Sequence, residues 1–575
     1  MKKIFGFIRE YKKYAILTPL CVIIETTIGL LIPFIISKII DNGIIANYGL
    51  NYIIKIGSIA VLLAFTSLFF SILSGIFASK ASRGFAKNLR QAIFDKIQSF
   101  SFYNIDKFST ASLITRITSD VVKIQNTFML LIRMGVRCSF RVIGATIMAI
   151  LINPKLSIIF IITALLLFII LITIATVVFP RFTELLKKED EMNLTMQENL
   201  INIRIVKSLV REDYEKEKFN KRAKNLKKAQ VYAEKLLSLN APAEDFVIYL
   251  SILAILWFGG NMIIKGDMKI GELSSFLTYT SQILFTIMMF AFLFVMLMFS
   301  KASINRILEV LEEEPDIVDG KKDVKFKDGS IEFKNVSFSY SKNKENLTLK
   351  NVNLKINSGE IIGIISSTGA GKTTLINLLS RLYNITDGVL EIGGNNIKDY
   401  KLKTLRSQIS IVLQKNTLFS GTIKENLLWG DKNATDEEII EVCKKAQAHD
   451  FIMSFPEGYN TYLEQGAVNI SGGQKQRLCI ARALLKKPKI LILDDSTSAV
   501  DTTTETKIRK VFKEEMPNIT KIIIAQRISS IEDADKIIVL DNGTINAIGM
   551  HNELIVSNDI YKSIYQLQKD GIMEE

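Results

Sequence analysis

The residues with the clearest chemical potential lie in a glycine-rich turn in the second half of the chain. The stretch EIIGIISSTGAGKTTLINLLSRL has the order strand, turn and helix, with Gly369, Gly371 and Lys372 in its turn. Glycines there let backbone N–H groups surround phosphate oxygens at a helix N-terminus, and a lysine neutralises their charge. The spacing therefore predicts a site for nucleotide phosphates. Its residues are Ser367, Thr368, Gly369, Ala370, Gly371, Lys372, Thr373 and Thr374.

Two aspartates close an apolar run further along the chain, in PKILILDD. Asp494 stands at the end of the predicted strand and is expected to hold Mg²⁺ across from the hydroxyl of Thr373. The usual phosphate-loop pattern has glycine where this chain has Ser366, so the loop departs from the pattern once.

A second phosphate-binding terminus is predicted between these two motifs, in NISGGQKQRLCIARALL. Small and hydroxyl-bearing residues precede a helical stretch, so their backbone N–H groups would face an anion. These residues are Ser471, Gly472, Gly473 and Gln474.

The composition indicates a membrane protein with more than one domain. The 575 residues exceed the usual size of one compact domain, and 48% of them are hydrophobic. The formal net charge of +14 would suit nucleic acid, but lysines and arginines gather between apolar runs rather than in one basic domain. No nucleic-acid partner is therefore expected.

Six apolar stretches are long enough to cross a bilayer, for which about 20 residues are needed. They lie at 14–40, 53–79, 130–152, 156–179, 246–264 and 273–299. The two long connections, near 80–129 and 180–240, are rich in Lys and Arg. The positive-inside rule therefore predicts a multi-pass protein of the cell membrane with both termini, the long loops and the second half in the cytoplasm. The first stretch lacks a small-residue cleavage site, so we interpret it as a retained span and not as a signal peptide.

The pattern of apolar and polar residues changes after the sixth apolar stretch. The long loops before it mix apolar and charged residues at helical spacing, whereas short β-branched runs alternate with helical stretches after LEEEPDIVDGKK. The predicted fold is an all-α six-helix membrane domain with long cytoplasmic helical extensions, fused to an α/β P-loop nucleotide-binding domain. The predicted boundaries are 1–315 for the membrane domain and 316–575 for the nucleotide-binding domain.

The order of the motifs SGGQKQR, ARALLKKPKILILDD and TSAVD resembles the nucleotide-binding domain of ATP-binding cassette (ABC) transporters. The resemblance implies ATP and Mg²⁺ as ligands. It implies that Tyr340 in VSFSY stacks on adenine, and that Gln414 in IVLQKNTLF contacts Mg²⁺ together with Thr373 and Asp494. The segment TSAVD, which ends at Asp501, is similar to the D-loop of the family.

The membrane half resembles that of ABC exporters. The segments FYNIDKFSTASLITRITSDVVKIQN and QENLINIRIVKSLVREDYEKEKF are similar to the two intracellular loops whose coupling helices press on the nucleotide-binding domains. Six spans ahead of one cassette is the layout of an exporter half-transporter. In this family two cassettes face each other, and each ATP lies between one phosphate loop and the opposite signature, so the resemblance implies a dimer in the lipid membrane.

Two catalytic positions depart from the family pattern. The residue after the metal-binding aspartate is usually a glutamate that polarises the attacking water, and here it is the shorter Asp495. The switch histidine, expected in a stretch such as IIIAHRISSI, is replaced by Gln526, and His449 and His551 lie elsewhere in the sequence. Glutamine can hydrogen-bond a phosphate or a water, but it does not take up a proton near neutral pH.

These departures predict a site that binds ATP and hydrolyses it slowly. The signature at 471–474, which serves the opposite nucleotide, is intact apart from Ile470, where leucine is commoner. We therefore predict a heterodimer in which this chain donates its signature to a hydrolysing site led by a second half-transporter chain. A homodimer with two slow sites is the alternative. Gln465 stands where the family has an acid, so the contact made just before the signature differs from the usual one.

Charged residues also occur inside the predicted spans. Glu25 either binds a cationic group or a proton, or faces a wet cavity or a neighbouring helix, and the second interpretation is preferred. Arg133, Arg137 and Arg141 share one face of the third span, where they either attract an anionic lipid or substrate or line an aqueous vestibule.

The predicted function is ATP-driven export of hydrophobic or amphipathic compounds, of the multidrug type. The sixth span is rich in Met and Phe, which suits promiscuous apolar binding, although packing against lipid explains the same composition. A lipid flippase is the alternative within the class. An ATP-binding regulatory or channel-like membrane subunit is the alternative outside it.

Overall fold

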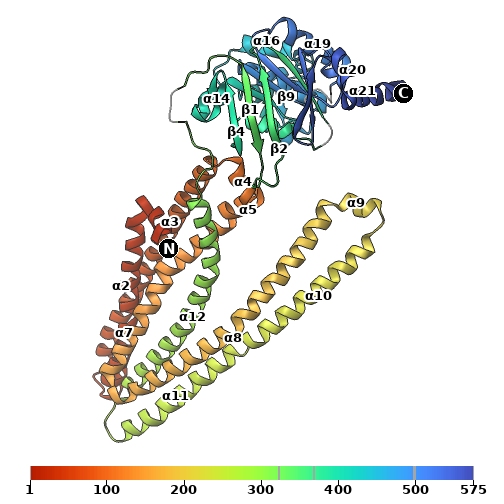
Figure 1. The fold of residues 1–575 in the computed structure, drawn as a ribbon. Helices are drawn as coiled ribbons and strands as arrows, with labels where there is room; N and C mark the ends of the chain where they lie inside the picture. The colour runs from red at the N-terminus through yellow and green to blue at the C-terminus, as the bar shows by residue number, and fades with distance from the viewer. Residues whose placement is uncertain (1, 321–323, 367–368, 496–499, 574–575) are drawn as a thin grey trace. The chain divides into compact units, whose positions relative to one another are not determined.

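The computed structural model describes residues 2–320, 324–366, 369–495 and 500–573, which form two compact units. The helical unit comprises Met1–Gln98 and Ala111–Glu312, and the sheet unit comprises Ser99–Thr110 and Glu313–Glu575 (Figure 1). A short piece of the first long loop therefore belongs to the same compact unit as the sheets.

The helical unit consists of long helices joined by short turns. They are α1 (Lys2–Phe5), η1 (Gly6–Tyr11), α2 (Lys12–Lys38), the π-helix η2 (Ile39–Ile45), α3 (Leu50–Gln98), α5 (Thr110–Thr115), the π-helix η3 (Arg116–Asp120), α6 (Val121–Leu130), the π-helix η4 (Leu131–Gly135), α7 (Val136–Ile152), α8 (Pro154–Ile201), α9 (Ile203–Ser208), α10 (Glu212–Leu237), α11 (Asn240–Ile264) and α12 (Ile270–Glu312).

Five helical stretches among the described residues are long and apolar enough to cross a membrane. They are Lys3–Ile45, Leu50–Gln98, Thr110–Ile152, Pro242–Ile264 and Ile270–Glu312. The remaining predicted span, 156–179, falls within α8, a helix of 48 residues that begins with the shorter apolar stretch Pro154–Leu167. Helix α3, with 49 residues, is far longer than a bilayer requires, in agreement with the predicted helical extensions.

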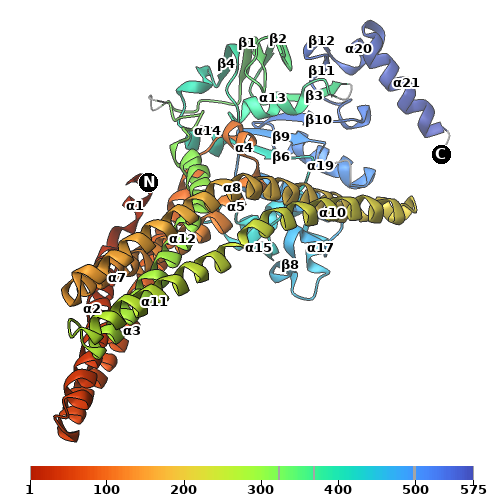
Figure 2. The ribbon, with the colours of Figure 1, turned by 90° about the horizontal axis from the view of Figure 1, so that it is seen from below.

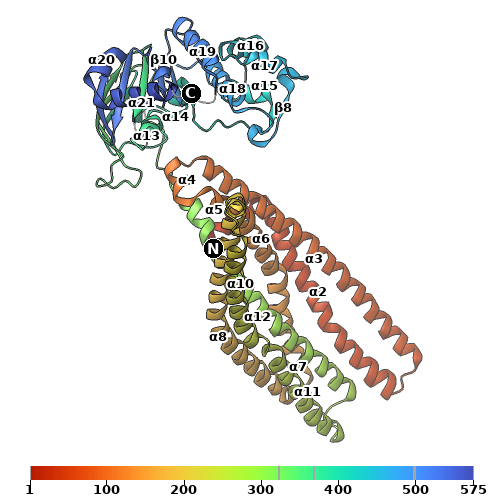
Figure 3. The ribbon, with the colours of Figure 1, turned by 90° about the vertical axis from the view of Figure 1, so that its right-hand side faces the viewer.

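Local sequence explains the start of α8, and a few polar contacts hold the helical unit together. Pro154 occupies the first turn, where its missing N–H is not needed, and the side chain of Asn153 accepts a hydrogen bond from the Leu156 N–H at 3.0 Å. Fully buried Tyr279 of α12 donates its hydroxyl to the Leu30 carbonyl of α2 at 2.6 Å. Helix α2 runs beside α3, and α8 runs beside α10 and α11 (Figures 1 and 3).

The sheet unit is built on a six-stranded sheet with the order β12-β11-β3-β10-β9-β6. Strands β11, β3, β10, β9 and β6 run parallel, and β12 pairs antiparallel with β11 at one edge. The strands are β3 (Ile361–Ser366), β6 (Ile409–Val412), β9 (Ile490–Asp494), β10 (Thr520–Ile524), β11 (Lys536–Asp541) and β12 (Thr544–Gly549). Every residue of β9 and β10 is buried, as expected for central parallel strands covered on both faces.

A second, antiparallel sheet has the order β2-β1-β4-β5, and β7 pairs with β8. These strands are β1 (Ile331–Phe338), β2 (Leu349–Ile356), β4 (Asp387–Ile392), β5 (Asn395–Asn396), β7 (Gly421–Thr422) and β8 (Tyr462–Leu463). Helix α13 lies beside β3 and β10 (Figure 2). Helices α15 to α18 gather with β8 in one lobe of the sheet unit (Figure 3).

The helices of the sheet unit are short. They are α4 (Phe102–Phe108), α13 (Lys372–Leu379), α14 (Leu402–Gln408), α15 (Ile423–Leu427), α16 (Asp436–Lys445), α17 (His449–Met453), α18 (Gly472–Leu485), α19 (Thr502–Glu514), α20 (His551–Ser557) and α21 (Asp559–Met573). The 3₁₀ turns are η5 (Ile397–Asp399), η6 (Gly458–Asn460), η7 (Gln465–Ala467) and η8 (Ile528–Ser530).

Helix α4 is held in the sheet unit by side-chain hydrogen bonds. The Tyr383 hydroxyl donates to Asp106 Oδ2 at 2.5 Å, and Asn104 donates to the Glu313 carboxylate at 2.9 Å. Lys107 forms an ion pair with the same glutamate at 2.7 Å. The predicted coupling segment of the first intracellular loop is thus anchored on the nucleotide-binding side.

Candidate nucleotide-binding and catalytic site

The predicted site residues lie where parallel strands of the six-stranded sheet end. Strand β3 ends at Ser366, β9 at Asp494 and β10 at Ile524, and β6 ends at Val412, two residues before Gln414. Because these strands are parallel neighbours, their carboxyl ends share one edge of the sheet. Segments from four distant parts of the sequence thereby converge on this edge.

The phosphate loop joins β3 to α13. Gly369 and Gly371 have φ values of +85° and +100°, which favour glycine. At Gly371 an added Cβ would also lie 2.8 Å from Leu349 Cδ2. Ser367 and Thr368 lie outside the described residues, and Ala370 is buried between the two glycines.

Lys372 opens helix α13 and turns back toward the end of β3. Its Nζ donates to the Ser366 hydroxyl at 2.7 Å and to the Ser366 carbonyl at 3.1 Å. A glycine at position 366 could offer only the carbonyl, so the departure from the usual pattern adds an acceptor for the lysine. Burial lowers the pKa of Lys372, and the carboxylates of Asp494 and Asp495 oppose that shift.

The aspartate at the end of β9 is buried, with 6% of its surface exposed. Burial raises the pKa of Asp494, the neighbouring charge of Asp495 raises it further, and Lys372 lowers it. A buried carboxylate with a second carboxylate directly beside it is a favourable setting for a divalent cation. Exposed Thr373, the second residue of α13, supplies a hydroxyl oxygen, which is a ligand type that Mg²⁺ accepts.

The carboxylate of Asp495 accepts hydrogen bonds from two glutamine side chains. Gln526 Nε2 donates to Oδ2 at 2.9 Å, and Gln414 Nε2 donates to the same oxygen at 3.3 Å. The backbone of Asp495 is also fixed, because its N–H donates to the Ile524 carbonyl at 2.8 Å and its φ is +47°. Positive φ at a non-glycine residue is uncommon and frequently marks functional turns. Asp495 therefore has little freedom to change position.

The predicted adenine-stacking residue lies beside α13. The ring of Tyr340 is 40% exposed, and its hydroxyl lies 3.1 Å from Oγ1 of buried Thr374. Asn377 donates to the same hydroxyl at 3.4 Å. An aromatic face next to the phosphate-loop helix is well placed to contact a nucleotide base.

The signature residues begin helix α18. Ser471 is the N-cap, its hydroxyl accepts from the Gln474 N–H at 3.2 Å, and the Gln474 side chain accepts from the Ser471 N–H at 2.9 Å. This capping box fixes the first turn, in which Gly472 leaves the backbone exposed. Just before it, Gln465 begins η7, a turn in which Gly466 has a φ of +71°.

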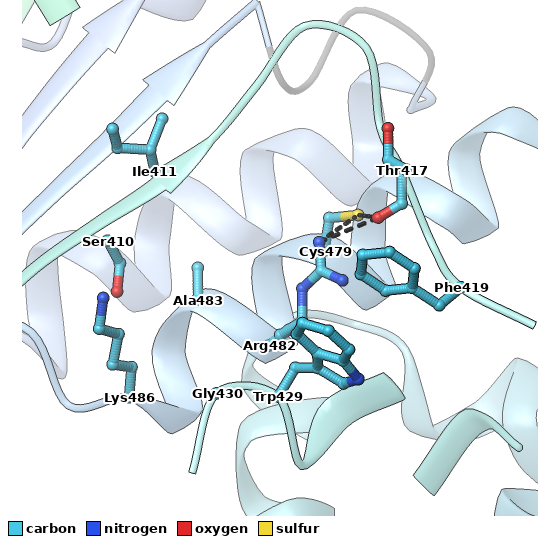
Figure 4. A pocket seen from close by; sticks show the side chains of 10 residues that line it. All are labelled: Ser410, Ile411, Thr417, Phe419, Trp429, Gly430, Cys479, Arg482, Ala483 and Lys486. Atoms are coloured by element: carbon cyan, nitrogen blue, oxygen red, sulfur yellow. Dashed lines mark hydrogen bonds between the residues drawn. The ribbon is translucent and has the colours of Figure 1, made fainter. Parts of the chain in front are cut away.

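A groove of about 310 Å³ lies between β6, the segment 417–430 and α18 (Figure 4). Its walls include the rings of Phe419 and Trp429, stacked with centroids 4.4 Å apart, and Arg482 of α18, which donates to the Thr417 carbonyl at 3.1 Å. Ser410 and Ile411 of β6 complete one side. The groove therefore adjoins both the segment that carries Gln414 and the helix that begins with the signature, and sequence reasoning did not identify it.

In the helical unit the charges of the predicted spans form an ion pair. Arg137 Nη2 donates to both carboxylate oxygens of Glu25, at 2.9 and 2.8 Å. Arg133 donates to the Ser71 carbonyl at 3.5 Å and lies beside Gly75, while Arg141 is half-buried one turn beyond Arg137. Glu25 therefore faces a neighbouring helix, which is one of the two surroundings that the preferred interpretation of the sequence allowed.

A membrane unit of long helices followed by a cassette with these motifs defines an ABC exporter half-transporter, whose ATPase domain is coupled to transport. The family model of the ABC transporter transmembrane region matches residues 15–303, and that of the ABC transporter domain matches residues 349–498. The chain belongs to the ABC transporter family, and the predicted family and fold class are confirmed.

Relatives match over nearly the whole chain. The ABC transporter ATP-binding protein YfiB of Bacillus subtilis (strain 168) is 36% identical over 568 residues, covering 99% of this chain and 98% of that protein. YgaD of the same organism, named as a multidrug export ATP-binding/permease protein, is 33% identical and covers 99% of each. The structure of a bacterial Atm1-family ABC exporter with ATP bound superposes with a TM-score of 0.84 over 98% of each chain, at 24% identity, and supports the fold.

Proposed function

We propose that this chain is one half of a heterodimeric exporter of hydrophobic or amphipathic compounds, and that its own ATP site hydrolyses slowly. One observation carries the proposal. The carboxylate in the position of the catalytic base, Asp495, is held by the amides of Gln414 and Gln526. Neither amide accepts a proton near neutral pH. The proton of an attacking water therefore cannot pass to the side chain at position 526, as it could to an imidazole.

The same site keeps the groups that bind nucleotide. Lys372 and the N–H groups of 369–374 would hold the phosphates, and Tyr340 would stack on adenine. Thr373, Gln414 and Asp494 would hold Mg²⁺, which supplies charge neutralisation of the β- and γ-phosphates when bound. Binding without efficient hydrolysis is the expected result, since both catalytic positions depart from the family pattern while the lysine and the Mg²⁺ ligands are kept.

The signature supports a division of labour between two chains. The N-terminus of α18 is capped and exposes backbone at Ser471 and Gly472, as an anion site at a helix terminus requires. In a dimer of this family that terminus serves the nucleotide of the opposite chain. We propose that the partner contributes the glutamate and histidine of the hydrolysing site, while 471–474 of this chain complete it.

The proposed substrate class rests on the relatives and on the membrane unit. YgaD is named for multidrug export, and the described part of α12 exposes large apolar side chains, including Phe285, Phe294 and Met298. Export of apolar or amphipathic compounds from the cytoplasm fits both. In this arrangement the sheet unit and both termini lie in the cytoplasm, as the charge of the long loops predicts.

Purification of the tagged chain from its native membranes, followed by mass spectrometry, tests the proposal. A second half-transporter chain in equal amount, with the glutamate and histidine in place, is the expected result. Isolation of a self-dimer that hydrolyses ATP and transports substrate would exclude the heterodimer. Movement of a fluorescent lipid, but of no drug, in liposomes would replace multidrug export with a flippase.

A further inference from the structure

The last helix of the chain reaches the loop that carries Gln526. The side-chain carbonyl of Gln568 in α21 accepts a hydrogen bond from the Ile528 N–H at 2.9 Å. The side-chain amide of Gln568 donates to the backbone carbonyl of Gln526 at 2.7 Å. One side chain thus pairs with the backbone on both sides of Arg527, and we call this pair of bonds the Gln568 clasp.

The clasp acts where the sheet no longer holds the chain. Strand β10 ends at Ile524, the Ala525 N–H still donates to the Ile364 carbonyl of β3 at 3.2 Å, and the turn η8 begins at Ile528. After Ala525 the backbone leaves the neighbouring strand, so its N–H and C=O groups need partners from elsewhere. Gln568, 40 residues further along the chain from Ile528, supplies one hydrogen-bond donor and one acceptor to this backbone.

Packing fixes the part of α21 that precedes the clasp. Tyr561 is fully buried, and its hydroxyl lies 2.7 Å from His551 Nδ1. Tyr565 packs on the same core one turn later, and Gln568 follows on the same face of the helix. Gln566, of the same residue type, points to solvent on another face. The helix repeat therefore places a polar side chain on the buried face, where its two partners are backbone groups of the catalytic loop.

We propose that Gln568 is a positioning residue for ATP hydrolysis. The clasp fixes the peptide of Gln526 from outside, and the side chain of Gln526 reaches Asp495 from that peptide at 2.9 Å. The position of the amide relative to the carboxylate, and to a phosphate bound beside it, therefore depends on the C-terminal helix. This inference rests on the proposed action of Gln526 at this site.

Single-turnover ATP hydrolysis by the full-length transporter, assembled with its native partner, tests the inference. Gln526→Ala first identifies the kinetic phase that this loop governs. Gln568→Ala is expected to slow the same phase by roughly tenfold, since a small misplacement of a catalytic group has effects of that order or larger, while ATP affinity stays unchanged. Gln566→Ala is the matched control and should leave the phase as it is.

A double variant separates positioning from folding. In the Gln526→Ala background, Gln568→Ala should cause no further slowing, because the amide that the clasp positions is gone. Gln568→Glu keeps the acceptor for Ile528 and loses the donor for Gln526, so it should slow the phase without unfolding the helix. Equal slowing by Gln568→Ala in both backgrounds, or none in either, would overturn the clasp. If Gln526→Ala alters no phase, the proposed action of Gln526 fails and the inference fails with it.

Discussion

The side-chain amide of Gln526 donates a 2.9 Å hydrogen bond to Oδ2 of Asp495, so the two residues predicted at the catalytic positions contact each other directly. The amide N–H is a hydrogen-bond donor to the carboxylate, and the amide has no basic nitrogen that could take up a proton. The hydrogen bond engages an electron pair of this carboxylate oxygen, which a general base would use to accept a proton. The two departures from the family pattern therefore act as one unit, and a single substitution would change both.

Restoring the family residues together should restore hydrolysis at this site. We expect Asp495→Glu with Gln526→His to raise single-site ATP turnover by roughly a hundredfold, the usual gain from a well-placed general base and its partner. Rapid-quench measurement of bound ATP converted to ADP checks this. The same pair of changes combined with Lys372→Ala is the control and should give no gain. A double variant that binds ATP and stays slow would place the impairment elsewhere.

The phosphate-loop lysine should be needed for nucleotide at this site and not for all turnover. Lys372→Ala removes the charge that opposes the phosphates, and we expect it to abolish the phase of ATP binding that belongs to this chain. Photolabelling with an azido-ATP analogue, followed by separation of the two chains, measures the loss. Turnover of the assembled pair should persist at a reduced rate. Complete loss of ATPase in a folded, assembled pair would contradict the asymmetric assignment.

Asp494, the buried aspartate at the end of β9, should lower the stability of the folded protein at neutral pH, although the proposed site uses it to hold Mg²⁺. Its pKa is raised, so the folded state binds the proton more tightly than the unfolded chain, and stability is lost as pH rises through the folded pKa. Asp494→Asn should therefore raise the melting temperature at neutral pH, and this gain should vanish below the unfolded pKa of 3.8. Differential scanning fluorimetry across pH, without nucleotide, provides the measurement.

A second aspartate offers a control of opposite sign. The N–H of Thr504 donates to Asp501 and lowers its pKa, so Asp501 contributes stability above the unfolded pKa that is lost as pH falls through the folded one. Asp501→Ala should lower the melting temperature at neutral pH. If both variants shift the melting temperature in the same direction at neutral pH, burial of Asp494 does not govern its effect.

The ion pair between two membrane helices should be a strong determinant of stability. Glu25→Gln leaves the partly buried Arg137 guanidinium without its carboxylate, and we expect a loss below the cost of breaking a fully buried pair, which is about 3–5 kcal/mol. Glu25→Gln with Arg137→Gln should recover most of the loss. Thermal unfolding in detergent measures both. Asp213→Asn, which breaks the fully exposed pair with Lys216, should leave the melting temperature unchanged.

The backbone arrangement of the site could be predicted from the sequence because it follows from local rules. An apolar β-branched run that ends in an acid predicts a buried parallel strand, and such strands present their carboxyl ends at one edge. Asp494 ends such a run, Gln414 and Gln526 follow apolar runs that end without an acid, and the structure brings all three segments to that edge. Five of the six predicted spans followed in the same way from length and hydropathy among the described residues, and the remaining one falls within α8.

Side-chain pairings over long sequence distances could not be predicted in this way. Nothing local in α21 signals that Gln568 bonds the loop at Gln526, although its place on the buried face of an amphipathic helix was a usable sign. The use of the Ser366 hydroxyl by Lys372 depends on a rotamer, and the Glu25–Arg137 pair depends on the register of two helices. Such contacts are decided by packing and not by spacing.

Helix α12 is longer than a bilayer is thick. It runs for 43 residues without a break, about 65 Å, and ends at Glu312. The next residues are secured at once, because Asn104 donates to the Glu313 carboxylate at 2.9 Å and to the Glu314 carbonyl at 3.0 Å. Because the hydrocarbon core of a bilayer is roughly 30 Å thick, about half of this helix would extend beyond it as a single hydrogen-bonded element.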